Sequence, residues 1–209
     1  MPVDPSRRLP LVLLGLVLLG LGWSATGPAD RFTWFMEVLP VLGALPLLAL
    51  TARRFPLTPL VYVFIALHAF ILMTGGRYTY ANVPLGDWVR DLLGLSRNPY
   101  DRLGHLAQGF VPALVVREFL LRRSPLRPGG LLVFLVFSVC LAISALYELL
   151  EWWTALATGE GASAFLGTQG DVWDTQWDMC LAGCGALVAQ LLLSRLQDRQ
   201  LKELLGTPA

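Results

Sequence analysis

Charged residues are scarce in this chain of 209 residues. They make up 15% of it, whereas apolar residues make up 55%. Ordinary soluble domains carry about 25% charged residues. Long stretches contain no charge at all, which excludes a soluble core, where polar residues recur every turn or two. The composition also excludes disordered, fibrous and disulfide-scaffold proteins. It indicates a membrane protein.

An excess of one charge sign is also missing, because 16 basic and 15 acidic residues give a net charge of +1. A nucleic-acid-binding protein normally has a basic footprint, so we expect no nucleic acid as a partner. The three cysteines, Cys140, Cys180 and Cys184, lie inside apolar stretches and form no C-x-x-C pair. We interpret them as packing residues.

Six apolar stretches approach the roughly 20 residues that a helix needs to cross a bilayer. We therefore predict an all-α, polytopic membrane protein with one transmembrane domain over residues 1–209. The predicted spans cover residues 9–26, 32–51, 57–75, 103–121, 129–152 and 174–194. The sixth reaches spanning length only if it includes Asp174 and Asp178. No internal repeat is evident, which disfavours an inverted-repeat transporter.

The basic residues predict the orientation. Ten lie beside alternate ends of the spans: Arg7, Arg8, Arg53, Arg54, Arg122, Arg123, Arg127, Arg195, Arg199 and Lys202. The other loops hold Arg31, Arg77, Arg90, Arg97 and Arg102 over longer segments. By the positive-inside rule, both termini are cytoplasmic. The alternative is a cleaved signal peptide, because Arg7 and Arg8 precede an apolar run, but no clean A-x-A site follows it.

The long connection over residues 75–102 faces outward in this topology. Trp88, Leu92 and Leu95 recur at helical spacing after a possible N-cap at Asp87. The pattern predicts a short amphipathic helix lying on the outer membrane face. An ordinary capped loop helix is the alternative.

Ionisable residues inside spans are costly, at least about 2–3 kcal/mol each near the bilayer centre. In the predicted topology they share the outer leaflet, where like-charged carboxylates need protons, arginines or a cation. Arg77 and Arg102 are the arginines expected to neutralise them. The residues concerned are Glu37, His68, Asp101, His105, Glu148, Glu151, Asp171, Asp174 and Asp178.

Carboxylates with one or two histidines favour a divalent metal, Zn, Mn, Fe or Mg, over Cu. No H-E-x-x-H motif is present. The spacing of Asp171, Asp174 and Asp178 resembles the acidic motif of phospholipid head-group transferases, but Thr175 and Met179 replace parts of that motif. Without a metal, the aspartates complement the helix N-terminus, the nearby tryptophans form an aromatic belt, and His68 makes an interhelical hydrogen bond.

Several long blocks resemble the YjdF-type family of small bacterial inner-membrane proteins. They cover residues 75–81, 83–86, 97–105, 108–110, 147–152 and 170–179. The resemblance implies a multi-pass protein of the bacterial inner membrane and brings no established activity. The segment from Asp174 to Gly185 also resembles the last helix of VanZ-like proteins.

Our leading hypothesis is a metal-dependent enzyme that acts on a lipid-linked or envelope substrate in an acidic pocket at the periplasmic leaflet. Its predicted metal ligands are His105, Glu148, Asp174 and Asp178. Glu151 is the candidate general base, and Tyr78, Arg77 or Arg102 would hold an anionic head group. One alternative is a proton- or cation-coupled transporter or channel. The other is a non-catalytic scaffold with a structural polar network.

Overall fold

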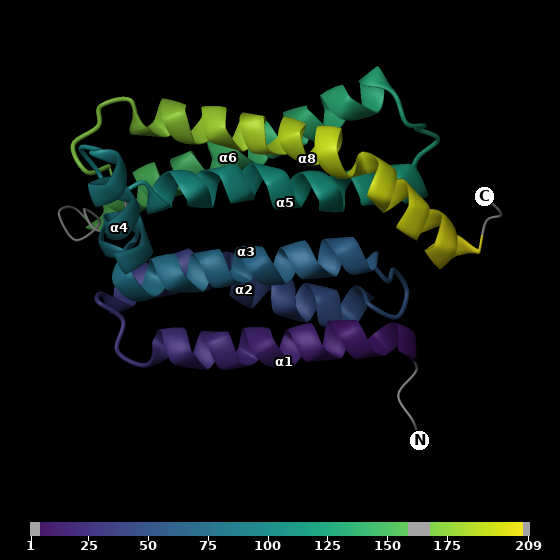
Figure 1. The fold of residues 1–209 in the computed structure, drawn as a ribbon, viewed down its shortest axis with the longest axis horizontal. Coiled ribbons are helices and arrows are strands. Elements are labelled where there is room, and N and C mark those ends of the chain that lie inside the picture. Colours follow the sequence, from purple (N-terminus) through teal and green to yellow (C-terminus); the bar gives the residue numbers. More distant parts are fainter. Residues whose placement is uncertain (1–4, 159–167, 207–209) are drawn as a thin grey trace.

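The computed structural model describes residues 5–158 and 168–206, which form seven α-helices, one 3-10 helix and no strand (Figure 1). The all-α prediction is confirmed for these residues. Six helices are long: α1 (Pro5–Ala25), α2 (Arg31–Thr51), α3 (Pro59–Tyr78), α5 (Tyr100–Arg123), α6 (Gly130–Thr158) and α8 (Asp174–Leu205). Two short elements, η1 (Tyr80–Asn82) and α4 (Pro84–Leu93), connect α3 to α5.

Local chemistry explains several helix ends. Asp30 caps α2, because its Oδ1 accepts a hydrogen bond from the backbone N–H of Thr33 at 2.7 Å. α4 begins with Pro84 in its first turn and ends at Gly94, whose φ of 63° is in the left-handed region. The predicted cap at Asp87 is wrong: Val83 is the N-cap of α4, and Asp87 lies inside the first turn, where it accepts a hydrogen bond from Arg90.

Among the described helices, five are long and apolar enough to cross a membrane: α1, α2, α3, α6 and α8. α5 contains the fourth predicted span but is not one of the five. Charged side chains occupy both of its ends, from Asp101 and Arg102 to Arg122 and Arg123. The polytopic membrane architecture is therefore confirmed with five candidate spans. The span predicted over residues 103–121, which α5 contains, stays a prediction.

The backbones of α5 and α8 approach each other so closely at two glycines that no larger residue would fit there. A Cβ on Gly109 would lie 1.8 Å from the backbone oxygen of Ala182, and one on Gly185 would lie 2.1 Å from that of Leu106. Small residues permit this approach, as is usual for packed membrane helices. The two backbones are consequently in contact along this crossing.

The long helices run side by side, and α4 lies across one end of the bundle (Figure 1). The first described turn of α1 and the last turn of α8 lie at the opposite end. Between the two ends, α3, α5, α6 and α8 share an apolar core that includes Val61, Leu114, Val136, Cys140 and Ala186. This apolar core lies between the α4 end of the bundle and the opposite end.

Candidate functional site

Four ionisable side chains from three helices meet at the α4 end of the bundle. α5 supplies Asp101 and His105, α6 supplies Glu148 and α8 supplies Asp178. All four are buried, and Asp178 is only 3% exposed. We call these residues the Asp–His group. Its members come from separate parts of the sequence and are brought together by helix packing.

The close crossing of α5 and α8 explains this meeting. His105 lies one helical turn before Gly109, and Asp178 lies one turn before Ala182. Because Gly109 contacts the backbone of Ala182, the side chains one turn earlier on each helix face each other. A larger residue at position 109 would therefore separate the two functional side chains.

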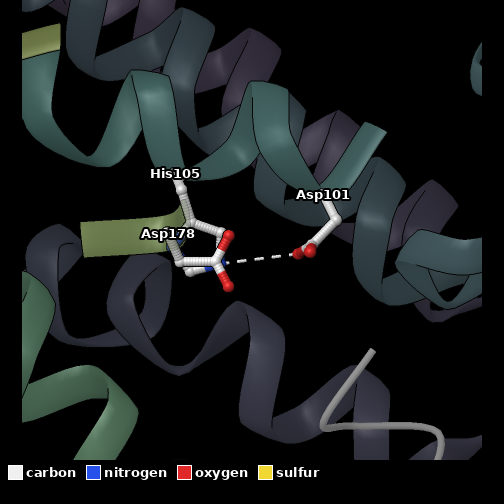
Figure 2. A group of neighbouring side chains, drawn as sticks. All are labelled: Asp101, His105 and Asp178. Atoms are coloured by element: carbon white, nitrogen blue, oxygen red, sulfur yellow. Dashed lines mark ion pairs between the residues drawn. The ribbon is translucent and has the colours of Figure 1, made fainter. Parts of the chain in front are cut away.

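His105 is the centre of the group (Figure 2). Its Nε2 lies 3.5 Å from Oδ1 of Asp101 and 3.7 Å from Oδ2 of Asp178. Its Nδ1 lies 3.2 Å from Oε1 of Gln108. That amide oxygen can only accept, so the contact is a hydrogen bond in the tautomer that carries its proton on Nδ1. The lone pair of a neutral imidazole would then point at two carboxylates, so a proton or a cation is needed at Nε2.

Two buried carboxylate oxygens of the group accept no hydrogen bond from the described residues. They are Oδ1 of Asp178 and Oε1 of Glu148, and the latter lies 4.0 Å from Nδ1 of His105. Leaving a buried acceptor without a donor costs about 1–3 kcal/mol, and more for a charged group. The arrangement therefore favours a bound cation, or protonation of the acids.

Arg97 lies beside the group in the loop between α4 and α5 and is buried. It donates hydrogen bonds to Oδ2 of Asp101 at 3.0 Å and to Oδ1 of Asp174, and lies 3.6 Å from Asp171. Asp174, a predicted metal ligand, is thus paired with a guanidinium. The sequence prediction treated Arg97 as an ordinary loop residue. The spacing of Arg97 and Asp101, four residues apart, was the available signal for an ion pair.

The acids around Arg97 keep it charged. Burial by itself would lower the pKa of the guanidinium, but the hydrogen bond to Asp174 and the charges of Asp174 and Asp101 raise this pKa above its ordinary value. Arg97 therefore offsets part of the negative charge at this end of the bundle. Two further carboxylates still need compensation: Asp178, which faces Nε2 of His105, and Glu148, which faces Nδ1.

Three further predicted residues lie near the group. Glu37 of α2 is buried and accepts a hydrogen bond from the hydroxyl of Tyr147 at 3.3 Å. The ring of Tyr147 lies 6.5 Å from that of His105. Glu151 is buried on α6, and His68 of α3 has a buried Nε2 without a hydrogen-bond partner among the described residues. Tyr147 was not predicted, because an aromatic residue in a span usually indicates packing.

The two arginines expected to neutralise the acids are placed differently. Arg102 lies 3.2 Å from Asp171. Arg77 instead donates hydrogen bonds to the carbonyl oxygen of Trp23 at 2.5 Å and stacks on its ring. Tyr78, a candidate for holding a head group, also packs against Trp23, with ring centroids 6.3 Å apart. Arg77 and Tyr78 thus join α3 to α1 rather than to the Asp–His group.

A second buried polar cluster lies at the opposite end of the bundle. Glu118 is fully buried and accepts hydrogen bonds from the backbone and hydroxyl of Thr58, at 3.1 and 2.8 Å, and from Arg122 at 2.9 Å. Arg117 pairs with Asp198 at 2.7 Å. These charges are well matched with partners, as expected of a structural network. The Asp–His group differs from this cluster, because two of its buried carboxylate oxygens accept no hydrogen bond from the described residues.

Comparisons with known proteins agree with this architecture. The family model described as "Predicted membrane protein (DUF2238)" matches residues 9–199. The chain is 57% identical over 199 residues to inner membrane protein YjdF of Escherichia coli (strain K12). The alignment covers 92% of this chain and 94% of that protein. No solved structure matches. The protein is therefore a multi-pass protein of the bacterial inner membrane, and the chain belongs to the DUF2238 family of membrane proteins.

Proposed function

We propose that the Asp–His group binds a divalent metal ion. The observation that carries the proposal is the spacing of the ligand atoms: one atom each of Asp101, His105 and Asp178 lies within 4.8 Å of the others. Two ligands bound at about 2.0–2.2 Å to a tetrahedral zinc lie about 3.3–3.6 Å apart. The distances of 3.5 and 3.7 Å from Nε2 of His105 to the two carboxylates are close to this value.

The surroundings support the same assignment. Metal-binding histidines usually donate their other N–H to a neighbour, and Gln108 is placed to accept it from His105. Arg97 orients the Asp101 carboxylate. Glu148, a predicted ligand, lies 4.0 Å from Nδ1 of His105, the ring nitrogen on the other side from the proposed metal. The proposed ligands are therefore Asp101, His105 and Asp178, with Asp101 in place of the predicted Asp174 and Glu148. One imidazole with carboxylates suits Zn, Mn or Fe, and Mg less well.

We further propose that the bound metal serves a hydrolytic or transfer reaction on a lipid-linked or envelope substrate. The metal would polarise a phosphoryl or carbonyl oxygen of the substrate. Glu151, one turn from Glu148 on α6, is the candidate general base. Arg102 is partly exposed and lines a cavity of about 300 Å³ with Arg97 and Asp171, where an anionic head group would be held.

Metal analysis of the detergent-purified protein tests the proposal. We expect about one Zn, Mn or Fe per chain after loading and washing. Asp178→Asn should lose it, because Asp178 contributes a ligand oxygen. Asp91→Asn is the matched control, since Asp91 is exposed on α4. Both variants should elute as the wild type does in size-exclusion chromatography. A wild type without metal after loading, or an Asp178→Asn variant that retains it, would refute the site.

A scaffold function is the second candidate, and the bridging of Asp101 and Asp174 by Arg97 favours it. In that case, Asp174→Asn should lower the unfolding temperature while the surviving protein keeps its cellular phenotype. A transporter has less support, because the apolar core around Leu114 and Val136 lies between the two polar ends. Reconstituted cation flux that Glu148→Gln abolishes would restore that candidate.

For the topology we propose six spans with both termini in the cytoplasm. The ion-pair contacts of α5 with α8 extend from His105 to Arg117, a length of about 18 Å along α5 at 1.5 Å per residue. α5 therefore runs beside a candidate span and would be the sixth. α4 would lie on the outer membrane face, since Leu85, Trp88 and Leu92 are exposed along it. An impermeant maleimide added to intact spheroplasts should label Asp91→Cys but not Arg127→Cys. The reverse pattern would contradict this orientation.

A further inference from the structure

An apolar groove runs between α6 and α8 on the surface of the bundle. Its volume is about 610 Å³, and its exposed lining is almost entirely apolar. Residues from both helices form it, among them Phe137, Leu141, Ala145, Met179, Gly183 and Leu187. Because both helices are candidate membrane spans, the groove opens toward the hydrocarbon of the bilayer.

The groove begins where the Asp–His group ends. Met179 directly follows Asp178, and Ala145 lies one turn before Glu148. From Met179 the groove continues to Leu187, about 12 Å along α8 at 1.5 Å per residue. One leaflet of hydrocarbon is about 15 Å deep. The groove thus extends from the level of the group through most of one leaflet.

Small residues make the hollow. Ala142, Ala145 and Gly183 line it, whereas Phe137 and Leu187 form its walls. A Cβ on Gly183 would lie 3.1 Å from the ring of Phe137, so even an alanine there would be tight. The groove is therefore shaped by particular residues of α6 and α8, and it offers a hydrocarbon chain contact on two sides.

We propose that this groove holds one acyl chain of a phospholipid whose phosphate lies at the Asp–His group. The inference rests on the proposed metal, because a divalent cation between phosphate and carboxylates removes their repulsion. It narrows the substrate class to a membrane lipid and excludes a soluble envelope compound. The chain end of the lipid lies near Leu187, its phosphate lies beside Asp178, and its head group extends toward Arg102.

Photo-crosslinking tests the groove. The full-length protein is reconstituted in liposomes that contain a trace of phosphatidylglycerol with a diazirine near the end of one acyl chain. After irradiation, adducts on the groove residues within Phe137–Ala145 and Met179–Leu187 should exceed those on Leu18 and Leu19 of α1, although these two leucines are well exposed. Uniform labelling of all exposed apolar residues would overturn the proposal.

Two variants sharpen the test. Ala142→Phe fills the groove, and adducts there should fall by about tenfold, which corresponds to about 1.4 kcal/mol of binding. Ile143→Phe places the same ring on the exposed opposite side of α6 and should leave the adducts unchanged. Equal labelling of the two variants would overturn the proposal. The metal content of both variants is measured as well, and Ala142→Phe should keep its metal.

The two proposals fail in different ways. If Asp178→Asn loses its metal while the groove is not labelled above background, the metal site stands and the lipid groove is wrong. If the groove is labelled in a protein that binds no metal, the lipid site stands without the proposed chemistry. A second copy of the chain could instead fill the groove. Disulfide crosslinking between copies through the exposed Cys180 would reveal it and would overturn lipid binding there.

Discussion

The contact between Gly109 and the backbone of Ala182 gives a sharp test of the helix packing. In Gly109→Ala, the new Cβ would lie 1.8 Å from the oxygen of Ala182. Real Cβ contacts essentially never fall below 3.0 Å, so the two backbones must separate by about 1.2 Å. A carbonyl oxygen cannot rotate away as the end of a side chain can. The strain therefore acts on α5 and α8 as whole helices.

The magnitude follows from two opposing effects. Overpacking of a tight site costs about 1–3 kcal/mol, and more where backbone must move. Replacing a helical glycine by alanine recovers up to about 1 kcal/mol of helix propensity. We expect a net loss of about 2 kcal/mol, which lowers the unfolding temperature of a chain this long by about 4–8 °C. Gly43→Ala is the control, because nothing lies within 4 Å of its new Cβ.

The measurement is the thermal midpoint of the purified protein in detergent, followed by tryptophan fluorescence. Gly43→Ala should unfold at or above the wild-type temperature, and Gly109→Ala should unfold below it. Ligand-to-metal distances tolerate shifts of only about 0.2 Å. Because the separation of α5 and α8 moves His105 away from Asp178, the folded Gly109→Ala protein should also bind the metal more weakly. If Gly109→Ala and Gly43→Ala unfold at the same temperature, the close crossing of α5 and α8 is wrong.

Two further predictions concern charge. Arg97→Met leaves Asp174 buried without its cation and should cost about 3–5 kcal/mol of unfolding free energy; the double variant with Asp174→Asn should recover part of this loss, and no recovery would contradict the pairing. Asp30 caps α2, and its hydrogen bond from Thr33 lowers the pKa of its carboxyl below 3.8. The cap is therefore complete above that value and is lost as the pH falls through the lower folded pKa. Asp30→Asn should keep about 1 kcal/mol of capping at every pH, so its stability advantage over Asp30→Ala stays constant. The advantage of the wild type should instead shrink as the pH falls below 3.8 and be lost through the lower folded pKa; parallel curves would refute this.

The helices could be predicted because their causes are local. Charge-free runs predicted the positions of α1, α2, α3, α6 and α8, and apolar spacing predicted a helix within the loop that contains α4. The end of a helix depends on single residues, and there the prediction of Asp87 as a cap failed. Pro84 fits the first turn of a helix, and α4 therefore starts earlier than Asp87.

The acids of the candidate site could be predicted individually, since an ionisable residue in an apolar run is conspicuous. The arginines that pair with these acids could not be predicted. Arg77 and Arg102 were as plausible as Arg97 for neutralising the carboxylates, because all three lie in the same connection over residues 75–102. Only the fold places the guanidinium of Arg97 between Asp101 and Asp174, and directs Arg77 toward Trp23 instead.

By itself, the sequence determined that this chain lies in a membrane. Low charge and long apolar runs decide how each segment partitions between water and lipid, and this does not depend on which segments pack together. Tertiary structure decided which of its many acids form a group. That outcome depends on how closely two helices approach, and Gly109 and Gly185 set this distance from positions a full turn or more away from the functional side chains. Periodicity along one helix carries no information about such a distance, since it is a property of two helices together.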